Sequence, residues 1–161
     1  MIGTIIVFIL IPIVALFINA VEEYNKGIPF DKSYKEVGIP VITLTNNGKQ
    51  FNFLVDTGAN YCIINEPHLT EFEHKELKGE GTIFGMEGNV QKTNFVQASL
   101  YYEKDEFIAN FQVLDISGAL DRINKQYGIT VHGVLGSEFL EENRSKINFI
   151  EHEVTYEQIK A

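Results

Sequence analysis

The sequence predicts a mostly β fold, and three observations support this prediction. Phe51, Phe53 and Val55 recur at every second position, which is the period of a strand with one buried face. Asn46-Asn47-Gly48, just before them, is typical of a tight hairpin turn. Segments rich in β-branched and aromatic residues then recur along the chain. Because 161 residues suffice for one core, we expect one folded domain.

The same patterns assign the individual elements. Strands are expected at 39–45, 49–56, 81–86, 89–102, 106–116, 129–135 and 146–156. Three segments are candidates for one or two short helices, namely 66–77, 119–127 and 137–143. Pro67 suits a first helical turn, Gly128 suits a helix end, and Ser137 suits a helix N-cap.

The N-terminal residues 2–18 form an uncharged apolar run that is long enough to cross a bilayer as a helix. No basic residue precedes the run, so a retained single-pass membrane anchor is favoured over a cleaved signal peptide. The alternative is cleavage near Ala20, which would leave a secreted or periplasmic domain. We therefore divide the chain into an anchor or signal segment at 1–20, a polar linker at 21–36 and the folded domain at 37–161.

Charge and cysteine content exclude some classes of partner and bond. The chain has 13 Lys and Arg against 22 Asp and Glu, a formal charge of -9, which would repel a phosphate backbone. Nucleic acid is therefore not expected as a partner. Cys62 is the only cysteine, so no intrachain disulfide can form, and its apolar neighbours predict a buried thiol.

Asp56-Thr57-Gly58 is the motif in this sequence that suggests chemistry. The acid follows the apolar strand residues Leu54 and Val55, and the glycine permits a tight turn with close backbone approach. Taken alone, the tripeptide also fits an aspartate that caps a turn in an ordinary β protein. The wider context has to decide between these two readings.

Three segments in order resemble the retropepsin-like aspartic proteases, the family of the retroviral proteases and their cellular relatives. Residues 54–59, Leu-Val-Asp-Thr-Gly-Ala, match the family signature, and residues 82–90 resemble its glycine-containing flap. Residues 133–140 resemble the apolar-apolar-Gly segment and short helix that pass beneath the catalytic loop. The resemblance covers roughly residues 37–156 and implies a closed-barrel-like half of an acid protease.

Acid protease chemistry needs two carboxyl groups. One carboxyl cannot both activate water and protonate a peptide carbonyl, whereas two adjacent carboxyls share one proton and divide the roles of base and acid. The chain offers only Asp56 in the required context, since the other aspartates, Asp31, Asp105, Asp115 and Asp121, are not followed by Thr-Gly or Ser-Gly. We therefore expect a homodimeric endopeptidase in which two Asp56 side chains activate one water.

The resemblance also implies roles for neighbouring residues. Thr57 would hydrogen-bond across the dimer axis, and the Gly58 backbone would contact substrate or an Asp56 carboxylate. Ala59 and Asn60 would contact the substrate main chain. In the flap, the residues expected to touch substrate are Phe84, Gly85 and Met86.

The remaining expectations concern ligands, partners and one structural glycine. A protein or peptide substrate and a second copy of the chain are the expected partners, and neither a cofactor nor a metal is expected. Gly136 is expected to be structural, because its lack of a side chain would let its segment pass close beneath the loop that follows Asp56. His68 and His74 lie six residues apart, on poorly matched faces of a helix, so a solvated polar face is favoured over a metal site.

Two alternatives to an active protease remain open from the sequence. The same fold could be a catalytically silent, membrane-anchored module that dimerises or binds an extended peptide by strand addition. An accidental motif in an anchored structural β domain is the less favoured alternative.

Overall fold

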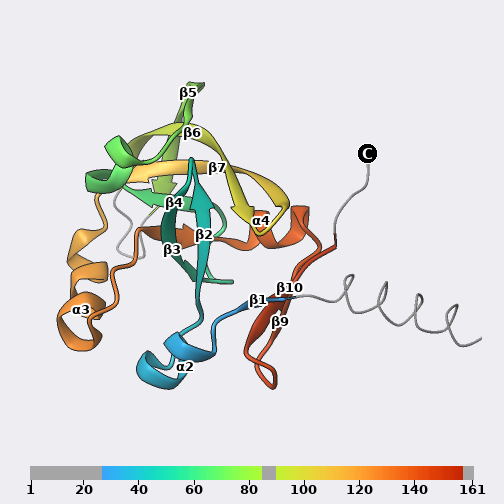
Figure 1. Ribbon diagram of the computed structural model, residues 1–161. Coiled ribbons are helices and arrows are strands. Elements are labelled where there is room, and N and C mark those ends of the chain that lie inside the picture. The colour runs from blue at the N-terminus through green and yellow to red at the C-terminus, as the bar shows by residue number, and fades with distance from the viewer. Residues whose placement is uncertain (1–26, 85–89, 158–161) are drawn as a thin grey trace, which may run out of the picture.

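The protein is described here by a computed structural model, which describes residues 27–84 and 90–157. Its main feature is a closed ring of six strands in the order β2-β3-β8-β4-β7-β6, and β6 pairs back to β2 through Tyr101 and Thr45 (Figure 1). The ring strands are β2 (Val41–Asn46), β3 (Lys49–Val55), β4 (Cys62–Asn65), β6 (Val90–Tyr102), β7 (Asp105–Leu114) and β8 (Gly133–Leu135). This confirms the mostly β, closed-barrel-like prediction.

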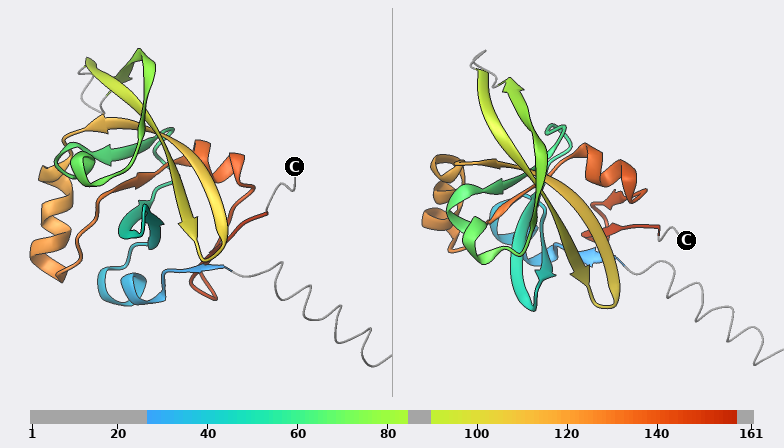
Figure 2. Two further views of the ribbon diagram at one scale, coloured as in Figure 1. Left: turned by 45° about the horizontal axis from the view of Figure 1, so that its top comes forward. Right: turned by 90° about the horizontal axis from the view of Figure 1, so that it is seen from above.

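Two further groups of strands lie outside the ring. β5 (Lys75–Phe84) pairs antiparallel with β6 and forms with it a long hairpin that projects from the ring (Figure 2). A separate three-stranded sheet has the order β1 (Ile28–Pro29), β10 (Glu153–Thr155) and β9 (Lys146–Asn148). The chain therefore begins and ends its described part in one small sheet.

β8 is the strand that closes the ring beside the Asp56 loop. It pairs parallel to β3 and antiparallel to β4, so that Leu54, Val134 and Ile63 lie in one row across three strands. A side chain at Gly133 would run into the carbonyl oxygen of Ile63. The strand expected at 129–135 is shorter than predicted, since β8 comprises only Gly133–Leu135, with His132 hydrogen-bonded to Asn52 and Asn65 at its start.

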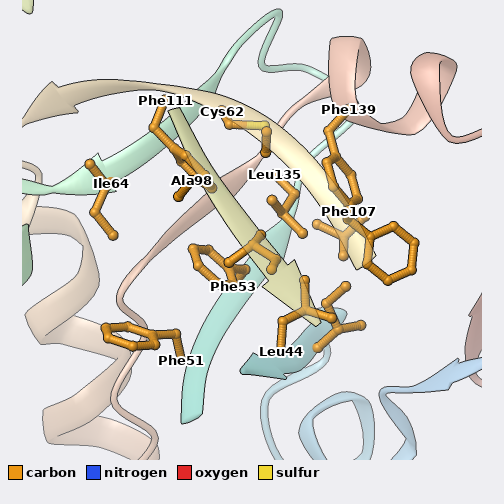
Figure 3. Close-up of a cluster of buried hydrophobic side chains, with 14 of the residues drawn as sticks. Leu44, Phe51, Phe53, Cys62, Ile64, Ala98, Phe107, Phe111, Leu135 and Phe139 are labelled. Carbon is orange, nitrogen blue, oxygen red and sulfur yellow. The ribbon is translucent and has the colours of Figure 1, made fainter. Parts of the chain in front are cut away.

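The core fills the ring with the inward residues of the alternating strands. Phe51, Phe53 and Val55 are buried, as their spacing predicts, and the Phe53 ring lies 5.7 Å from that of Phe111 (Figure 3). Cys62 is buried in the same core, which confirms the prediction for the only thiol. Burial raises the pKa of the Cys62 thiol to about 12, so the group is protonated at physiological pH.

The helices are more numerous than predicted. The described residues contain α2 (Asp31–Val37), α3 (Ser117–Tyr127), α4 (Ser137–Glu142) and the 3-10 helix η1 (Glu66–Glu71). The expected helices at 119–127 and 137–143 correspond to α3 and α4. The helix expected at 66–77 is wrong beyond residue 71, because Lys75 and the residues after it pair with β6 instead.

Part of the segment expected as a linker, 21–36, has regular structure, since Ile28–Pro29 form β1 and Asp31–Val37 form α2. Ile28 and Phe30 are buried in the main core, and Ser33 is the buried residue of α2. The Ser33 hydroxyl accepts the N–H of Val41 at 2.9 Å and donates to the carbonyl of Phe30 at 3.0 Å. These contacts attach α2 to the start of β2.

The predicted anchor at residues 2–18 lies outside the described residues and stays a prediction. Within the ranges 27–84 and 90–157, no helix combines the length and apolar character needed to span a bilayer.

Candidate active site

Asp56 lies where β3 leaves the ring, in a turn that its own carboxylate stabilises. Its N–H continues the ladder by donating to the carbonyl of Leu135 at 3.0 Å. The N–H of Gly58 donates to Asp56 Oδ1 at 2.8 Å, and the N–H of Ala59 donates to the Asp56 carbonyl at 3.2 Å. The side chain stays half-buried, so its outer oxygen is accessible to a ligand.

The residues after Asp56 form the exposed surface of this turn. Thr57, Gly58 and Asn60 are exposed, and Ala59 is partly so. A Cβ atom on Gly58 would lie 3.2 Å from Asp56 Oδ1, which is tighter than ordinary van der Waals contact. The glycine therefore lets the backbone N–H reach the carboxylate without crowding it.

The segment from Gly136 to Glu138 supports the turn from below. A Cβ atom on Gly136 would lie 2.5 Å from the carbonyl oxygen of Tyr61 and 2.7 Å from that of Ala59, so the expected close passage is confirmed. The N–H of Ser137 donates to the Ala59 carbonyl at 2.8 Å, and the N–H of Glu138 donates to the Asn60 carbonyl at 3.1 Å. The start of α4 thus fixes the loop with N–H groups that have no partner within the helix.

The side chain of Asp56 shares its face of the sheet with apolar neighbours. Phe53 and Val55 point into the core, so Leu54 and Asp56 point to the opposite side. Val134 lies directly across from Leu54, and Ile63 lies directly across from Val134, so the three residues form one apolar row on this side of the sheet. Val134 is buried, Ile63 is partly buried, and Leu54 packs against a second core cluster of Val41, Leu120 and Val131.

A sequence-family comparison identifies this arrangement. The model of the family described as retroviral aspartyl protease matches residues 38–148, which include the Asp56 turn, the β5–β6 hairpin and the Gly136 segment. The chain belongs to this retropepsin-like family.

A solved structure of the EIAV protease complexed with the inhibitor HBY-793 shares the fold of this chain. The two chains match with a TM-score of 0.51 at 18% sequence identity, over 69% of this chain and 93% of that chain. No curated protein matches this chain.

The flap expected of a retropepsin-like protein corresponds to the β5–β6 hairpin. Its outermost described pair joins Phe84, the last residue of β5, to Val90. Gly85 and Met86 lie outside the described residues. The three proposed flap contacts with substrate therefore stay predictions, as do the roles of Thr57, Ala59 and Asn60.

The structure brings His68 close to His132, a pairing that sequence reasoning missed. Their rings lie 4.7 Å apart, and His132 Nδ1 accepts the N–H of Asn52 at 2.9 Å. Burial and then the neighbouring His68 lower the pKa of His132, which favours the neutral ring. His74 instead donates from Nδ1 to the carbonyl of Phe72 at 2.6 Å. Among the described residues, no group of three or more His, Cys, Asp or Glu could hold a metal ion.

Sequence reasoning also missed the apolar row of Leu54, Val134 and Ile63 on the Asp56 side of the sheet. One signal was available, because a strand period of two places Leu54 in phase with Asp56. No sequence signal placed Val134 and Ile63 beside Leu54, since residues 54 and 134 are eighty positions apart.

Proposed function

We propose that the chain is an aspartic endopeptidase that acts as a homodimer and hydrolyses peptide bonds with one Asp56 from each subunit. The proposal rests chiefly on the Asp56 carboxylate, which emerges half-buried from a turn braced by its own Gly58 and by the Gly136 segment. Membership in the aspartic protease family supports this assignment. The similarity to a retroviral protease fold is consistent with it.

The proposed reaction divides two protonation states between two copies of Asp56. The ionised carboxylate takes a proton from water as the water oxygen bonds to the peptide carbonyl carbon. The protonated carboxyl donates its proton to the carbonyl oxygen. The C–N bond of the tetrahedral intermediate then breaks as the first carboxyl, now protonated by the water, gives its proton to the amine nitrogen, which leaves as the new N-terminus. One hydroxyl of the intermediate returns its proton to the second carboxylate as the product carbonyl forms.

The geometry also suggests which peptides are preferred. Leu54, Val134 and Ile63 form one apolar row on the side of the sheet to which Asp56 points, so we expect apolar side chains next to the scissile bond. Ala59 and Asn60 of the Asp56 loop would contact the substrate main chain.

The test uses the full chain, a peptide library and mass spectrometry of the products. Asp56→Asn should lower cleavage by roughly 10²- to 10⁴-fold, because it removes the general acid and base. Asp121→Asn, which changes an exposed aspartate of α3, serves as the matched control and should cleave normally. Equal cleavage by both variants would refute the catalytic role of Asp56. No cleavage by the unchanged chain, together with peptide binding, would favour the silent module.

Dimeric catalysis has a separate test. When Asp56→Asn is mixed in equal amounts with the unchanged chain and allowed to exchange subunits, about a quarter of the dimers keep two Asp56 carboxyls. Activity should therefore fall to about half of that of the same amount of unchanged chain alone. Mixing with Asp121→Asn should cause no loss. If mixing with Asp56→Asn also causes no loss of activity, each chain works alone.

We also propose that residues 2–18 anchor the protease to a membrane, on the evidence of their uncharged apolar sequence. Flotation of the full chain with vesicles, compared with a chain lacking residues 1–20, tests this anchor. The mass of the mature chain from cells distinguishes an anchor from cleavage near Ala20.

A further inference from the structure

The turn between β9 and β10 exposes two adjacent apolar side chains, Phe149 and Ile150, here called the hairpin tip. Ile150 is 87% exposed and Phe149 is 51% exposed, the first and third highest values among the large apolar residues noted as exposed in the described part of the chain, with Ile108 at 57% between them. Turns of soluble domains favour polar residues at such positions, because these side chains face water. The exposure of two apolar side chains in this turn therefore needs a physical explanation.

The structure holds the hairpin tip in a fixed shape. Asn148 Oδ1 accepts the N–H of Ile150 at 2.9 Å and that of Glu151 at 3.2 Å, which closes the turn locally. The Phe149 ring lies 5.7 Å from Phe30 and 5.5 Å from Tyr34, so α2 supports it from one side. Ile150 is thus presented outward by an ordered turn.

The hairpin tip also lies in the same small sheet as the first described strand. β10 pairs with β1 through Val154 and Ile28, and β1 follows the apolar residues 2–18. Nine residues, 19–27, separate this apolar run from Ile28. Such a connection spans at most about 30 Å when fully extended. A membrane that holds residues 2–18 is therefore within reach of this sheet.

The hairpin tip points away from the proposed flap. In Figure 1, β9 and β10 lie at the lower end of the molecule, beside β1 and α2, whereas the β5–β6 hairpin is at the top. Contact between the hairpin tip and a membrane would thus leave the β5–β6 hairpin free.

We infer that Phe149 and Ile150 insert into the interfacial region of the membrane that anchors residues 2–18. Apolar and aromatic side chains are favoured at the boundary between headgroups and acyl chains. Two side chains bind a bilayer weakly on their own, but the tether supplies a high local concentration of membrane surface. A second copy is the alternative occupant, but the short connection between residues 2–18 and this sheet favours the membrane. The inference rests on the proposed anchor and is independent of the proposed protease activity.

The absence of tryptophan from the chain makes a direct test possible. Ile150→Trp places one reporter at the hairpin tip, in full-length protein reconstituted in phosphatidylcholine vesicles with or without brominated acyl chains. Its emission should shift to shorter wavelength and lose intensity with brominated lipid. Tyr127→Trp, at the 38% exposed end of α3, is the matched control and should show neither change. Thermal melting of both variants verifies that each is folded.

Three other outcomes would overturn the inference. Emission of the position-150 reporter that stays at long wavelength without quenching would show that the hairpin tip faces water. A shift that grows with protein density but is insensitive to brominated lipid would identify a second copy as the occupant. Failure of the full chain to float with vesicles would refute the membrane anchor together with this inference, and it would leave the cleavage tests of Asp56 unaffected.

Discussion

The Asn46-Asn47-Gly48 turn and the Asp56-Thr57-Gly58 loop share a local pattern, in which Asn or Asp is followed by one residue and then glycine. In the first turn, Asn47 and Gly48 have φ angles of 47° and 75°, the left-handed conformation of a tight hairpin. In the second, Gly58 keeps an ordinary φ, and its N–H bonds to the Asp56 carboxylate. The same pattern thus produces two different backbone shapes.

The two turns also differ in what surrounds them. The Asn46 side chain donates to the carbonyls of Glu73 and Ser99 and so faces inward as a structural group. The Asp56 loop instead receives its support at the backbone, from Leu135 and the start of α4, and its side chain remains available. A polar turn residue becomes a candidate catalytic group when other segments satisfy the backbone around it and leave its side chain free.

Gly136→Ala should have the largest effect on stability. The substitution disturbs the close packing of the Gly136 segment against the Asp56 loop, and the Asn46 turn has no equivalent of this packing. The new Cβ atom would meet the backbone carbonyl oxygens of Ala59 and Tyr61, neither of which can rotate away. We expect a loss of about 3 kcal/mol or more in the free energy of unfolding, or no folded protein. Urea denaturation followed by circular dichroism measures this, and an unchanged midpoint would show that the crossing has room.

Asn46→Ala tests the support of the other turn. The substitution leaves the Glu73 N–H, which donates to Asn46 Oδ1 at 2.6 Å, and two carbonyls without their partner. The free energy of unfolding should fall by about 1–3 kcal/mol, the usual effect of buried polar groups left unpaired. Peptide cleavage per folded molecule should stay normal, since Asn46 lies outside the Asp56 loop. A selective loss of cleavage would contradict this separation of roles.

Gly48→Ala should have a smaller effect than Gly136→Ala, although both add one methyl group. No atom lies within 4 Å of the position of a Cβ on Gly48, so the only cost is the left-handed backbone. We expect a loss of about 1 kcal/mol in the free energy of unfolding. Urea denaturation of Gly48→Ala and Gly136→Ala side by side compares the two losses directly. Equal losses in the free energy of unfolding would show that the backbone around Gly136 moves to accommodate the new methyl group.

The smallest expected effect is a pH dependence of the free energy of unfolding, which arises from the hydrogen bond between His132 and Asn52 of β3. His132 Nδ1 accepts the Asn52 N–H, and its pKa is lowered from the ordinary 6.5, so folding favours the neutral ring. This stabilisation is full above pH 6.5 and is lost as the pH falls through the lowered value. His68 faces the ring, and Glu71 acts on it electrostatically and opposes the shift.

Urea denaturation between pH 8 and pH 5 checks this prediction. The unchanged chain should lose stability towards acid more steeply than His132→Asn, which cannot titrate at this position. His74→Asn is the matched control and should follow the unchanged chain, because the His74 ring bonds to the Phe72 carbonyl and lies away from the Asn52 N–H. Parallel curves for all three proteins would show that His132 titrates equally in the folded and unfolded states.

Local patterns in the sequence were sufficient for several features. The alternation of Phe51, Phe53 and Val55 predicted the buried face of β3, and Asn46-Asn47-Gly48 predicted the hairpin before it. The order of the motifs around Asp56, residues 82–90 and Gly136 indicated the family. These features were predictable because each depends on residues that are neighbours in the chain, or on a signature that spans a few positions.

The tertiary structure decided the features that depend on distant partners. Residues 28–36 looked like a polar linker, yet Ile28 pairs with Val154, more than a hundred positions away. His132 became a support of β3, and Leu54, Val134 and Ile63 became one apolar face, only when β8 inserted between β3 and β4. A local pattern specifies the shape of a turn or the period of a strand. The burial, pairing and protonation of a side chain depend on which distant segment packs against it, and only the folded chain fixes that choice.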